Sequence, residues 1–202
     1  MNQKERMLTG LPYRADFDGL PEERDACKRK IFAYNQTPPW EHEALSTQLR
    51  ELLGKVGEGS CIEPPFHCDY GWNIELGSGC FINYNLTILD VGKVTIGDSC
   101  LFAPNVSIYT AGHPIHPDSR LSYYEYGIPI TIGNRVWLGG NVVVLPGVTI
   151  GDDAVIGAGS VVTKDIPAGW IAAGNPCKLI RQITEADRDY YFKDRKFDVT
   201  DY

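Results

Sequence analysis

The sequence lacks the features of an exported or membrane-anchored chain. Its first ten residues, MNQKERMLTG, contain no apolar core, so no signal peptide is expected. No run approaches the roughly 18 apolar residues of a membrane span. The six cysteines form neither CxxC pairs nor a dense framework. These absences predict a cytoplasmic protein with buried, reduced thiols, and they leave disulfides as the minor alternative.

Positive charge is scarce as well. The 202 residues carry 19 Lys and Arg against 26 Asp and Glu, a net charge of -7, which argues against a nucleic-acid or anionic-membrane surface. An anionic ligand must therefore be bound by a local cluster of basic residues. With 43% hydrophobic residues, a chain of this length is able to bury roughly 70% of its unfolded surface in one substantial domain.

A repeat of six residues organises most of the chain. From Ile132 to Pro167 it reads IGNRVW, LGGNVV, VLPGVT, IGDDAV, IGAGSV and VTKDIP, and an apolar residue opens each unit. The same period begins at Val56, with two extra residues added around 70–73 and again around 90–93. A hexapeptide period predicts a parallel β-helix, and three units per coil predict a three-sided prism.

Residues 109–131 interrupt this repeat. The segment TAGHPIHPDSRLSYYEYGIP is rich in Pro, Tyr and charge and fits no inward-facing pattern. Long loops inside compact repeats are usually functional. We therefore expect an extruded loop that carries chemistry.

The two ends of the chain differ from the repeat. Residues 1–54 show helical periodicity over 24–34 and 41–53, separated by the breaker TPPW, and they predict an N-terminal helical cap. The charged tail, 184–202, predicts a short C-terminal helix with Thr184 as its N-cap.

Several ordered motifs surround the hexapeptides, namely MLTGLPYRADFDGLPEER, EPPFHCDYGWNIELG, FINYNLTILD, TIGDSCLFAPNVSIYTAGHP, PITIGNRVWLGG and IPAGWIAAGNPCKLIR. With this set the chain resembles the maltose and galactoside O-acetyltransferases of the hexapeptide acyltransferase superfamily over nearly its whole length. The resemblance implies a mainly β fold, a left-handed parallel β-helix at 55–183. It also implies a homotrimer with an active site at each subunit interface, acetyl-CoA as co-substrate and no metal.

His113 is the candidate catalytic base. Acetyl transfer from a thioester to a hydroxyl needs a base, and histidine titrates near neutral pH. His113 stands between Gly112 and Pro114 in the interruption, and it matches the family's catalytic His. Transfer is expected to be direct, because no GxSxG or comparable Cys signature indicates a covalent acyl-enzyme.

The neighbouring His116 raises metal binding as an alternative. Two His without a third ligand nearby make a weak metal site, and the remaining His42 and His67 lie in other parts of the sequence. The sequence therefore predicts no metal.

Acceptor contacts follow from the resemblance. The matching residues have carboxylate, amide or guanidinium groups suited to sugar hydroxyls, and they are Asp16, Arg24, Asp69, Asn83 and Asp90. Asp69 and Glu125 stand where the galactoside enzyme has Ser and Met, so no galactoside preference is assumed. Glu125 either contacts the acceptor or orients His113, and Asn83 is also a candidate for positioning His113 or the thioester carbonyl.

Donor contacts follow in the same way. The segments GGN and GAGS offer small residues and exposed backbone for the pantetheine arm, and basic residues near the end of the repeat suit the phosphates. The family match assigns the donor contacts to Trp137, Gly140, Ala158, Thr163, Lys164, Lys178 and Arg181.

The sequence thus predicts an acetyl-CoA-dependent O-acetyltransferase that acts on a hydroxyl of a maltose-, glucose- or galactoside-like sugar. The alternatives on the same scaffold acetylate serine, an antibiotic or a lipo-oligosaccharide. A non-catalytic β-helix trimer is the alternative from another class, although it has no need for His113 together with the basic donor residues.

Overall fold

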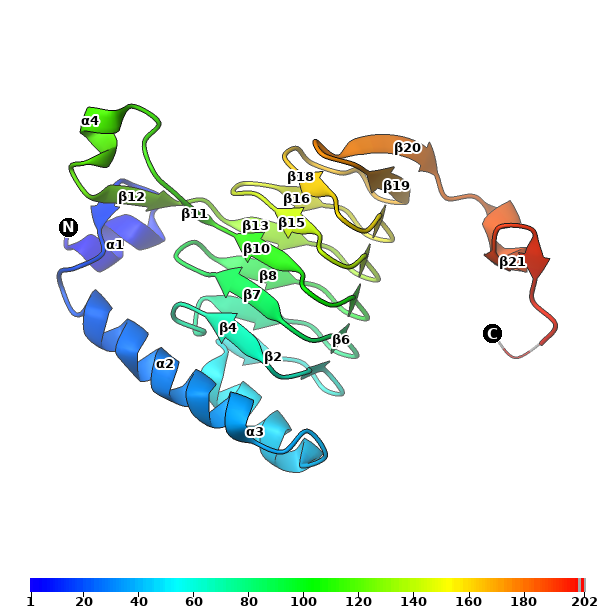
Figure 1. Ribbon diagram of the computed structural model, residues 1–202, viewed down its shortest axis with the longest axis horizontal. Helices are drawn as coiled ribbons and strands as arrows, with labels where there is room; N and C mark the ends of the chain where they lie inside the picture. Colours follow the sequence, from blue (N-terminus) through cyan, green and yellow to red (C-terminus); the bar gives the residue numbers. More distant parts are fainter. Residues whose placement is uncertain (200, 202) are drawn as a thin grey trace.

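Short parallel strands wind round a triangular prism in this protein (Figure 1). The computed structural model describes residues 1–199 and 201. The chain visits three faces in turn, so the strands of the coils pair in parallel with strands of the neighbouring coils. The last strand of the stack, β20, instead pairs antiparallel with β19, its neighbour in sequence. The architecture is the predicted left-handed parallel β-helix.

Each face of the prism is one sheet. Face 1 contains β2 (Lys55–Val56), β5 (Ile74–Leu76), β8 (Val94–Ile96), β13 (Ile130–Ile132) and β16 (Thr149–Ile150). Face 2 contains β3 (Cys61–Ile62), β6 (Phe81–Ile82), β9 (Leu101–Phe102), β14 (Trp137–Leu138), β17 (Val155–Ile156), β19 (Trp170–Ala173) and β20 (Lys178–Gln182). Face 3 contains β4 (Phe66–Cys68), β7 (Leu86–Leu89), β10 (Ser107–Tyr109), β15 (Val143–Val144) and β18 (Val161–Val162).

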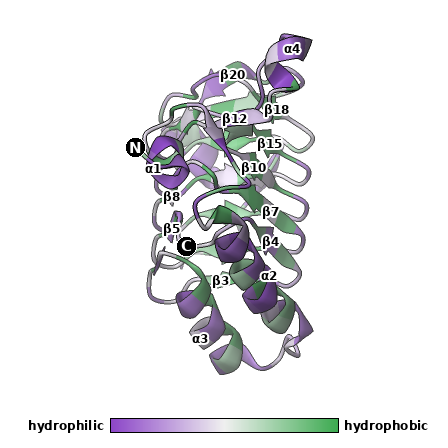
Figure 2. Cartoon of the chain, turned by 90° about the vertical axis from the view of Figure 1, so that its left-hand side faces the viewer, coloured by the Kyte–Doolittle hydropathy of each residue, from purple (hydrophilic) through white to green (hydrophobic). Residues whose placement is uncertain are grey.

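The apolar residue that opens each hexapeptide points into the prism. Fully buried examples, with 0% relative exposure, are Ile82, Ile88, Leu138, Val144 and Ile150. Burying one such side chain stabilises the fold by about 1.5–3 kcal/mol, and every face of every coil contributes one. Figure 2 shows hydrophobic colouring on strands of successive coils. Because the interior is filled in this way, chemistry is confined to the edges and outer faces.

The turns between face 2 and face 3 stack into one edge, which we call the Asn83 edge. It is formed by Asn83, Ala103, Gly139, Gly157 and Ala173, and each of the first four donates its backbone N–H to a carbonyl of the next coil at 2.8–2.9 Å. Small residues are needed here. A Cβ on Gly139 would lie 2.6 Å from the backbone nitrogen of Ala158.

The turns between face 3 and face 1 form a second edge, the arm edge, which takes all the irregularities of the repeat. Both two-residue insertions lie here, between β4 and β5 and between β7 and β8. The interruption at 109–131, the arm, also leaves from this edge, and it contains β11 (Ala111–Gly112), α4 (Pro117–Arg120) and β12 (Tyr124–Gly127).

The arm is more ordered than a loop. Strand β12 pairs antiparallel with β11 and also with β1 (Tyr13–Arg14) from the N-terminal segment. This small sheet fixes the arm against residues that lie about a hundred positions earlier in the sequence. The hexapeptide pattern contains no signal for it, because the pairing is non-local.

The N-terminal cap consists of α1 (Gln3–Leu8), α2 (Leu20–Gln36) and α3 (His42–Leu52). Helix α3 buries Leu45, Leu49 and Leu52, which lie on one face of the helix predicted over 41–53. Helix α2 begins four residues before the predicted start, because Gly19 adopts a left-handed conformation and Pro21 is tolerated in the first turn. Within the described residues, no helix combines the length and apolarity needed to cross a membrane.

The predicted C-terminal helix is correct only for its first turn. Thr184 caps a five-residue 3₁₀ helix, η1 (Glu185–Asp189), in a capping box with Asp187. The chain then forms a hairpin of β21 (Tyr190–Phe192) and β22 (Arg195–Lys196), which projects away from the prism (Figure 1). Consecutive aromatic residues favour a strand over a helix, and this preference outweighs the charge pattern.

The cysteine prediction holds for four of the six residues. Cys27, Cys68, Cys80 and Cys100 are buried, whereas Cys61 is exposed and Cys177 is half-buried. All six are free thiols. The outward position of Cys61, first in its strand, explains its exposure.

Candidate active site

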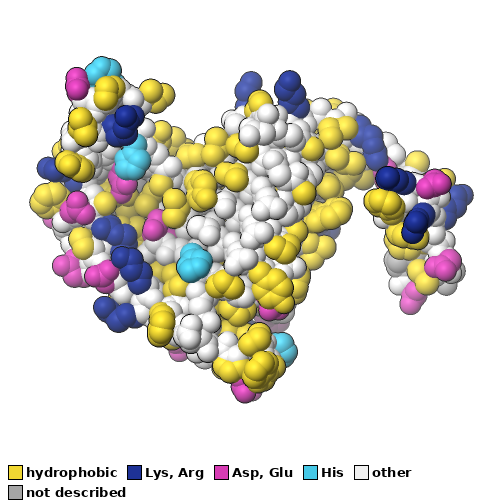
Figure 3. All heavy atoms as spheres, in the orientation of Figure 1, with side chains coloured by type: hydrophobic (Ala, Val, Ile, Leu, Met, Phe, Trp, Pro, Cys, Tyr) yellow, Lys and Arg dark blue, Asp and Glu magenta, His cyan; other side chains and the backbone are white. Residues whose placement is uncertain are grey.

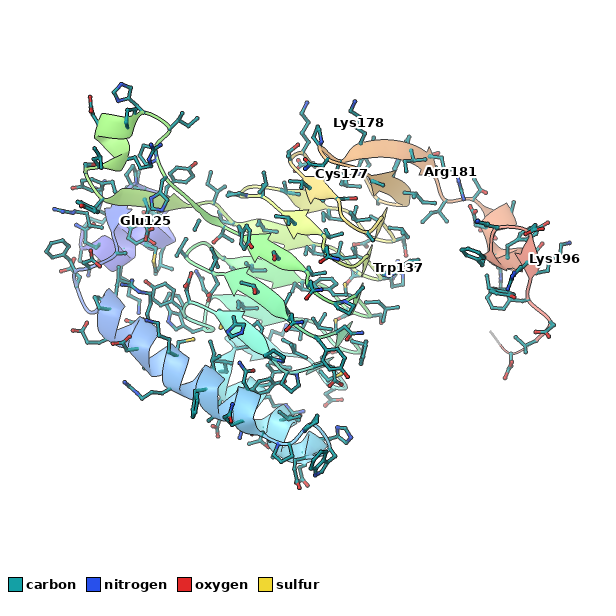
Figure 4. The ribbon with its side chains drawn as sticks, viewed as in Figure 1. Glu125, Trp137, Cys177, Lys178, Arg181 and Lys196 are labelled. Carbon is teal, nitrogen blue, oxygen red and sulfur yellow. The ribbon has the colours of Figure 1, made fainter. Side chains whose placement is uncertain are left out.

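A pocket of about 260 Å³ opens where the arm meets the N-terminal segment. It is lined by Ala15, Asp16, His113, Arg120, Tyr123 and Glu125. Figure 3 shows histidine, acidic and basic side chains gathered in this region, and Figure 4 labels Glu125 within it. The pocket therefore combines His113 with two of the residues predicted to contact the acceptor.

His113 lies on the arm, directly after strand β11. At Gly112 the strand passes so close to Tyr126 that a Cβ would lie 2.5 Å from the Tyr126 ring. The imidazole of His113 is 56% exposed, and its Nε2 lies 3.8 Å from Oε2 of Glu125. This separation exceeds a hydrogen bond, and it places the carboxylate within ion-pair distance of the ring if His113 is protonated.

Glu125 is held from the opposite side by Tyr13. The Tyr13 hydroxyl donates a hydrogen bond of 2.6 Å to Oε1 of Glu125. Burial, together with the bonded carboxylate, raises the pKa of Tyr13 far above its ordinary value. The sequence does not single out Tyr13, because a tyrosine 112 positions from Glu125 carries no local signal of this contact.

Asp69 interacts electrostatically with the residues of this region. Burial and the neighbouring carboxylate of Asp90 raise the pKa of Asp69 to about 6, and the guanidinium of Arg24 opposes this shift. The Glu125 carboxylate also raises the Asp69 pKa, so these groups share one electrostatic environment. Asp69 is therefore a carboxyl with a raised pKa that lies in the electrostatic field of the pocket residue Glu125.

Arg24 connects the cap to this region. Its Nη1 donates hydrogen bonds to the backbone carbonyl of Ala15 at 2.8 Å and to the hydroxyl of Tyr70 at 2.9 Å. Its Nη2 lies 3.8 Å from the carboxylate of Asp16. Arg24 thus supports the turn that carries Asp16, one of the pocket residues.

Asp90 differs from the expectation of a direct acceptor contact. Its side chain is fully buried, and its carboxylate accepts hydrogen bonds of 2.8–3.0 Å from the backbone N–H groups of Asp69, Tyr70 and Gly71. With both oxygens occupied inside the protein, Asp90 shapes the turn that presents Asp69. Asp90 lies at a corner of the repeat, and the sequence around it did not indicate that its side chain is buried.

Two further predicted residues lie apart from the pocket. Asn83 belongs to the Asn83 edge, and its side chain accepts a hydrogen bond of 2.8 Å from the backbone of Tyr84. Within one chain it therefore does not reach His113. His116 lies beyond the pocket on the arm and caps α4 by accepting a hydrogen bond of 3.3 Å from the backbone of Asp118.

The predicted donor residues form two groups. Trp137, Gly140 and Ala158 lie on face 2 or at its junction with the Asn83 edge. Thr163, Lys164 and Lys178 instead line a separate cavity of about 320 Å³ near the C-terminal end of the prism. Figure 4 shows Glu125 and Trp137 on opposite sides of the coil stack. One chain alone therefore does not bring the donor residues of face 2 to His113.

Arg181, the last predicted donor residue, is engaged by the tail. Its two terminal nitrogens bind the two carboxylate oxygens of Asp187 at 2.8 and 2.6 Å. This bidentate pair holds the pKa of Asp187 well below its ordinary value. An anionic ligand of Arg181 would have to compete with Asp187.

Comparison with known proteins identifies the family. The family model described as the maltose acetyltransferase hexapeptide capping motif matches residues 6–57, and the bacterial transferase hexapeptide model matches residues 129–164. Galactoside O-acetyltransferase of Escherichia coli K12 is 47% identical over 97% of each chain. The chain belongs to the maltose and galactoside O-acetyltransferase family.

Solved structures agree with this assignment. A galactoside acetyltransferase in complex with coenzyme A superposes with a TM-score of 0.95 at 47% identity, covering 98% of this chain and 100% of that one. A maltose O-acetyltransferase from Clostridium difficile 630 gives a TM-score of 0.90 at 50% identity, covering 92% and 99%. This member of the family is accordingly an acyltransferase of the hexapeptide-repeat type.

Proposed function

We propose that this protein transfers an acetyl group from acetyl-CoA to a hydroxyl of a sugar, with His113 as the general base. The observation that carries the proposal is the pocket itself, where an accessible imidazole lies 3.8 Å from a carboxylate oxygen and faces further polar groups. The relatives of this chain include enzymes named for galactoside and maltose acceptors, and one of the solved structures contains coenzyme A.

The reaction follows from the chemistry of His113. Its neutral imidazole removes the proton from the acceptor hydroxyl as the oxygen attacks the thioester carbonyl. Collapse of the tetrahedral intermediate breaks the carbon–sulfur bond, and the imidazolium returns the proton to the departing thiolate of CoA. The products are the O-acetyl sugar and CoA, and the base is regenerated without a covalent acyl-enzyme.

The acceptor is bound, in this proposal, by polar groups around the pocket. Asp16 and Glu125 line the pocket, and Asp69 and Arg24 share its electrostatic environment. Carboxylates and a guanidinium bind vicinal hydroxyls in pairs, which favours a sugar over an isolated alcohol. An acceptor screen distinguishes this proposal from its alternatives, in which the acetylated molecule is serine, an antibiotic or a lipo-oligosaccharide.

The donor, acetyl-CoA, is proposed to lie between copies of the chain. Gly140 and Ala158 offer backbone and space beside the Asn83 edge, whereas His113 lies on the arm edge. A trimer that sets the Asn83 edge of one copy against the arm of the next joins the two halves. This arrangement also places Asn83 of one copy near His113 of the next. The proposed reaction involves no metal.

Release of free CoA from acetyl-CoA in the presence of a sugar panel tests the proposed function. The wild-type protein should release CoA only when a suitable sugar hydroxyl is present. The variant His113→Ala should lose turnover by roughly 10²- to 10⁴-fold while still binding acetyl-CoA. His116→Ala is the matched control, because His116 lies on the same arm outside the pocket, and it should retain near-native turnover.

Near-native turnover in His113→Ala would reject the role of His113. Failure of the wild-type protein to bind acetyl-CoA would instead favour a non-catalytic β-helix trimer.

A further inference from the structure

Tyr13 and Glu125 meet across an antiparallel pair of strands. In the pairing of β1 with β12, these two residues are direct partners, so their side chains lie side by side on the same face. Tyr13 is fully buried and its hydroxyl donates to Oε1 of Glu125 at 2.6 Å. The other carboxylate oxygen, Oε2, faces Nε2 of His113 at 3.8 Å.

The geometry points to a positioning residue: we propose that Tyr13 fixes the Glu125 carboxylate so that its free oxygen faces the catalytic base. The inference rests on the proposed role of His113 and adds a residue that acts through Glu125. Tyr13 itself is too deeply buried to touch an acceptor in the pocket, and it is absent from the pocket lining.

The hydrogen bond has a fixed direction. Because burial raises the pKa of Tyr13 well above its ordinary value, the hydroxyl remains protonated and donates throughout the neutral range. A glutamate side chain has three rotatable bonds, and one strong hydrogen bond removes much of that freedom. Glu125 is thereby held in one orientation before the acceptor binds.

The chemical consequence appears when His113 takes the proton. The imidazole then becomes a cation, and the fixed carboxylate at this distance stabilises it without having to move. Arg24 and Asp69 belong to the same electrostatic environment, because the charge of Glu125 raises the pKa of both.

The variant Tyr13→Phe removes only the hydroxyl and tests this inference. Loss of one charge-assisted hydrogen bond should lower kcat about tenfold, with little change in the KM for acetyl-CoA. Tyr34→Phe is the matched control, because the Tyr34 hydroxyl donates a buried hydrogen bond from helix α2 to the carbonyl of Ile62 in β3, outside the pocket. Its kcat should stay near the wild-type value.

A double-mutant cycle separates positioning from general destabilisation. In a Glu125→Ala background, Tyr13→Phe should cause no further loss of kcat, because its only route to His113 has been removed. Equal effects of Tyr13→Phe with and without Glu125 would overturn the inference. So would a Tyr13→Phe kcat equal to that of Tyr34→Phe.

Crystal structures provide a readout that does not depend on activity. In Tyr13→Phe, Glu125 should adopt several orientations or turn away, so that its distance from Nε2 of His113 lengthens. An unchanged Glu125 would contradict the inference even if no sugar is acetylated. Inactivity of the wild-type protein on every hydroxyl acceptor, by contrast, would count against the proposed function and leave this structural test standing.

Discussion

The carboxylate of Asp90 holds the backbone of Asp69 in place. It accepts the Asp69 N–H at 2.8 Å and also the N–H groups of the next two residues, all from within the protein. The turn that presents Asp69 to the pocket is therefore built on a buried charge. The two acidic residues have the same chemistry but different surroundings, because Asp90 is fully buried, whereas Asp69 is half-buried and lies in the electrostatic field of Glu125.

Replacing Asp90 should destabilise the protein. Asp90→Asn places an amide N–H₂ group where a backbone donor now binds, and an unsatisfied buried donor costs about 1–3 kcal/mol. Asp98→Asn is a suitable control, because Asp98 accepts the N–H of Ser78 at 2.7 Å from an exposed position. Its cost should be less than about 1 kcal/mol. Urea denaturation measures both, and equal losses would contradict the structural role given to Asp90.

Asp69 should make stability depend on pH. Its folded-state pKa, raised to about 6, lies above its unfolded value, so the ionised carboxylate costs free energy of folding, and this cost is complete above about pH 6. Asp69→Asn removes the charge and should raise the free energy of unfolding at pH 7.5 by about 1 kcal/mol. The difference should shrink to a small fraction near pH 4, where the carboxyl is protonated in the folded state and about half protonated in the unfolded state. A difference that is constant between pH 4 and 7.5 would show that the charge is not the cause.

Adjacent glycines of the Asn83 edge should respond differently to alanine. A Cβ on Gly139 meets backbone at 2.6 Å, whereas a Cβ on Gly140 meets nothing closer than the Pro104 carbonyl at 3.4 Å. Gly139→Ala should therefore lose more than about 2 kcal/mol of stability, and Gly140→Ala less than about 1 kcal/mol. If Gly140 borders the donor, Gly140→Ala should nevertheless weaken CoA binding severalfold. Calorimetric titration with CoA checks this, and unchanged affinity would remove Gly140 from the donor site.

The pair of Arg181 and Asp187 should control donor affinity. Asp187 occupies both terminal nitrogens of Arg181, so Asp187→Ala should release the guanidinium for a phosphate and strengthen CoA binding. Arg181→Ala should weaken binding, and both effects should shrink at high salt. Weaker binding in Asp187→Ala would indicate that the pair acts as a unit instead of competing with the ligand.

The repeat made the fold predictable because the signal is periodic. The opening residue of each hexapeptide has one environment, the prism interior, and Ile82, Leu138 and Val144 all lie there. The break in the period located the arm for the same reason. The place of His113 between Gly112 and Pro114 marks it in the sequence as the candidate base, and the structure puts it in a pocket with Glu125.

Non-local contacts explain what the sequence did not reveal. Tyr13 reaches Glu125 only because β1 adds to the arm sheet, and Asp90 is buried only because the turn of the preceding coil folds over it. In the tail, one helical turn gives way to a hairpin whose aromatic residues Tyr191 and Phe197 contact each other. Each of these features depends on residues distant in the chain or on competition between propensities, which a single sequence pattern does not resolve.

The central claim is that each active site combines the arm of one copy with the Asn83 edge of another, and mixed trimers test it most directly. His113→Ala disables the arm, and Gly140→Leu is designed to block the donor path at a position with space beside its backbone. Each variant alone should be nearly inactive. When equal amounts of the two variants assemble at random into cyclic trimers, a site is intact only if its arm comes from Gly140→Leu and its edge from His113→Ala. This combination should occur in about a quarter of the sites. Recovery of about a quarter of wild-type CoA release is the predicted result. A mixture no more active than the separate variants would contradict the claim.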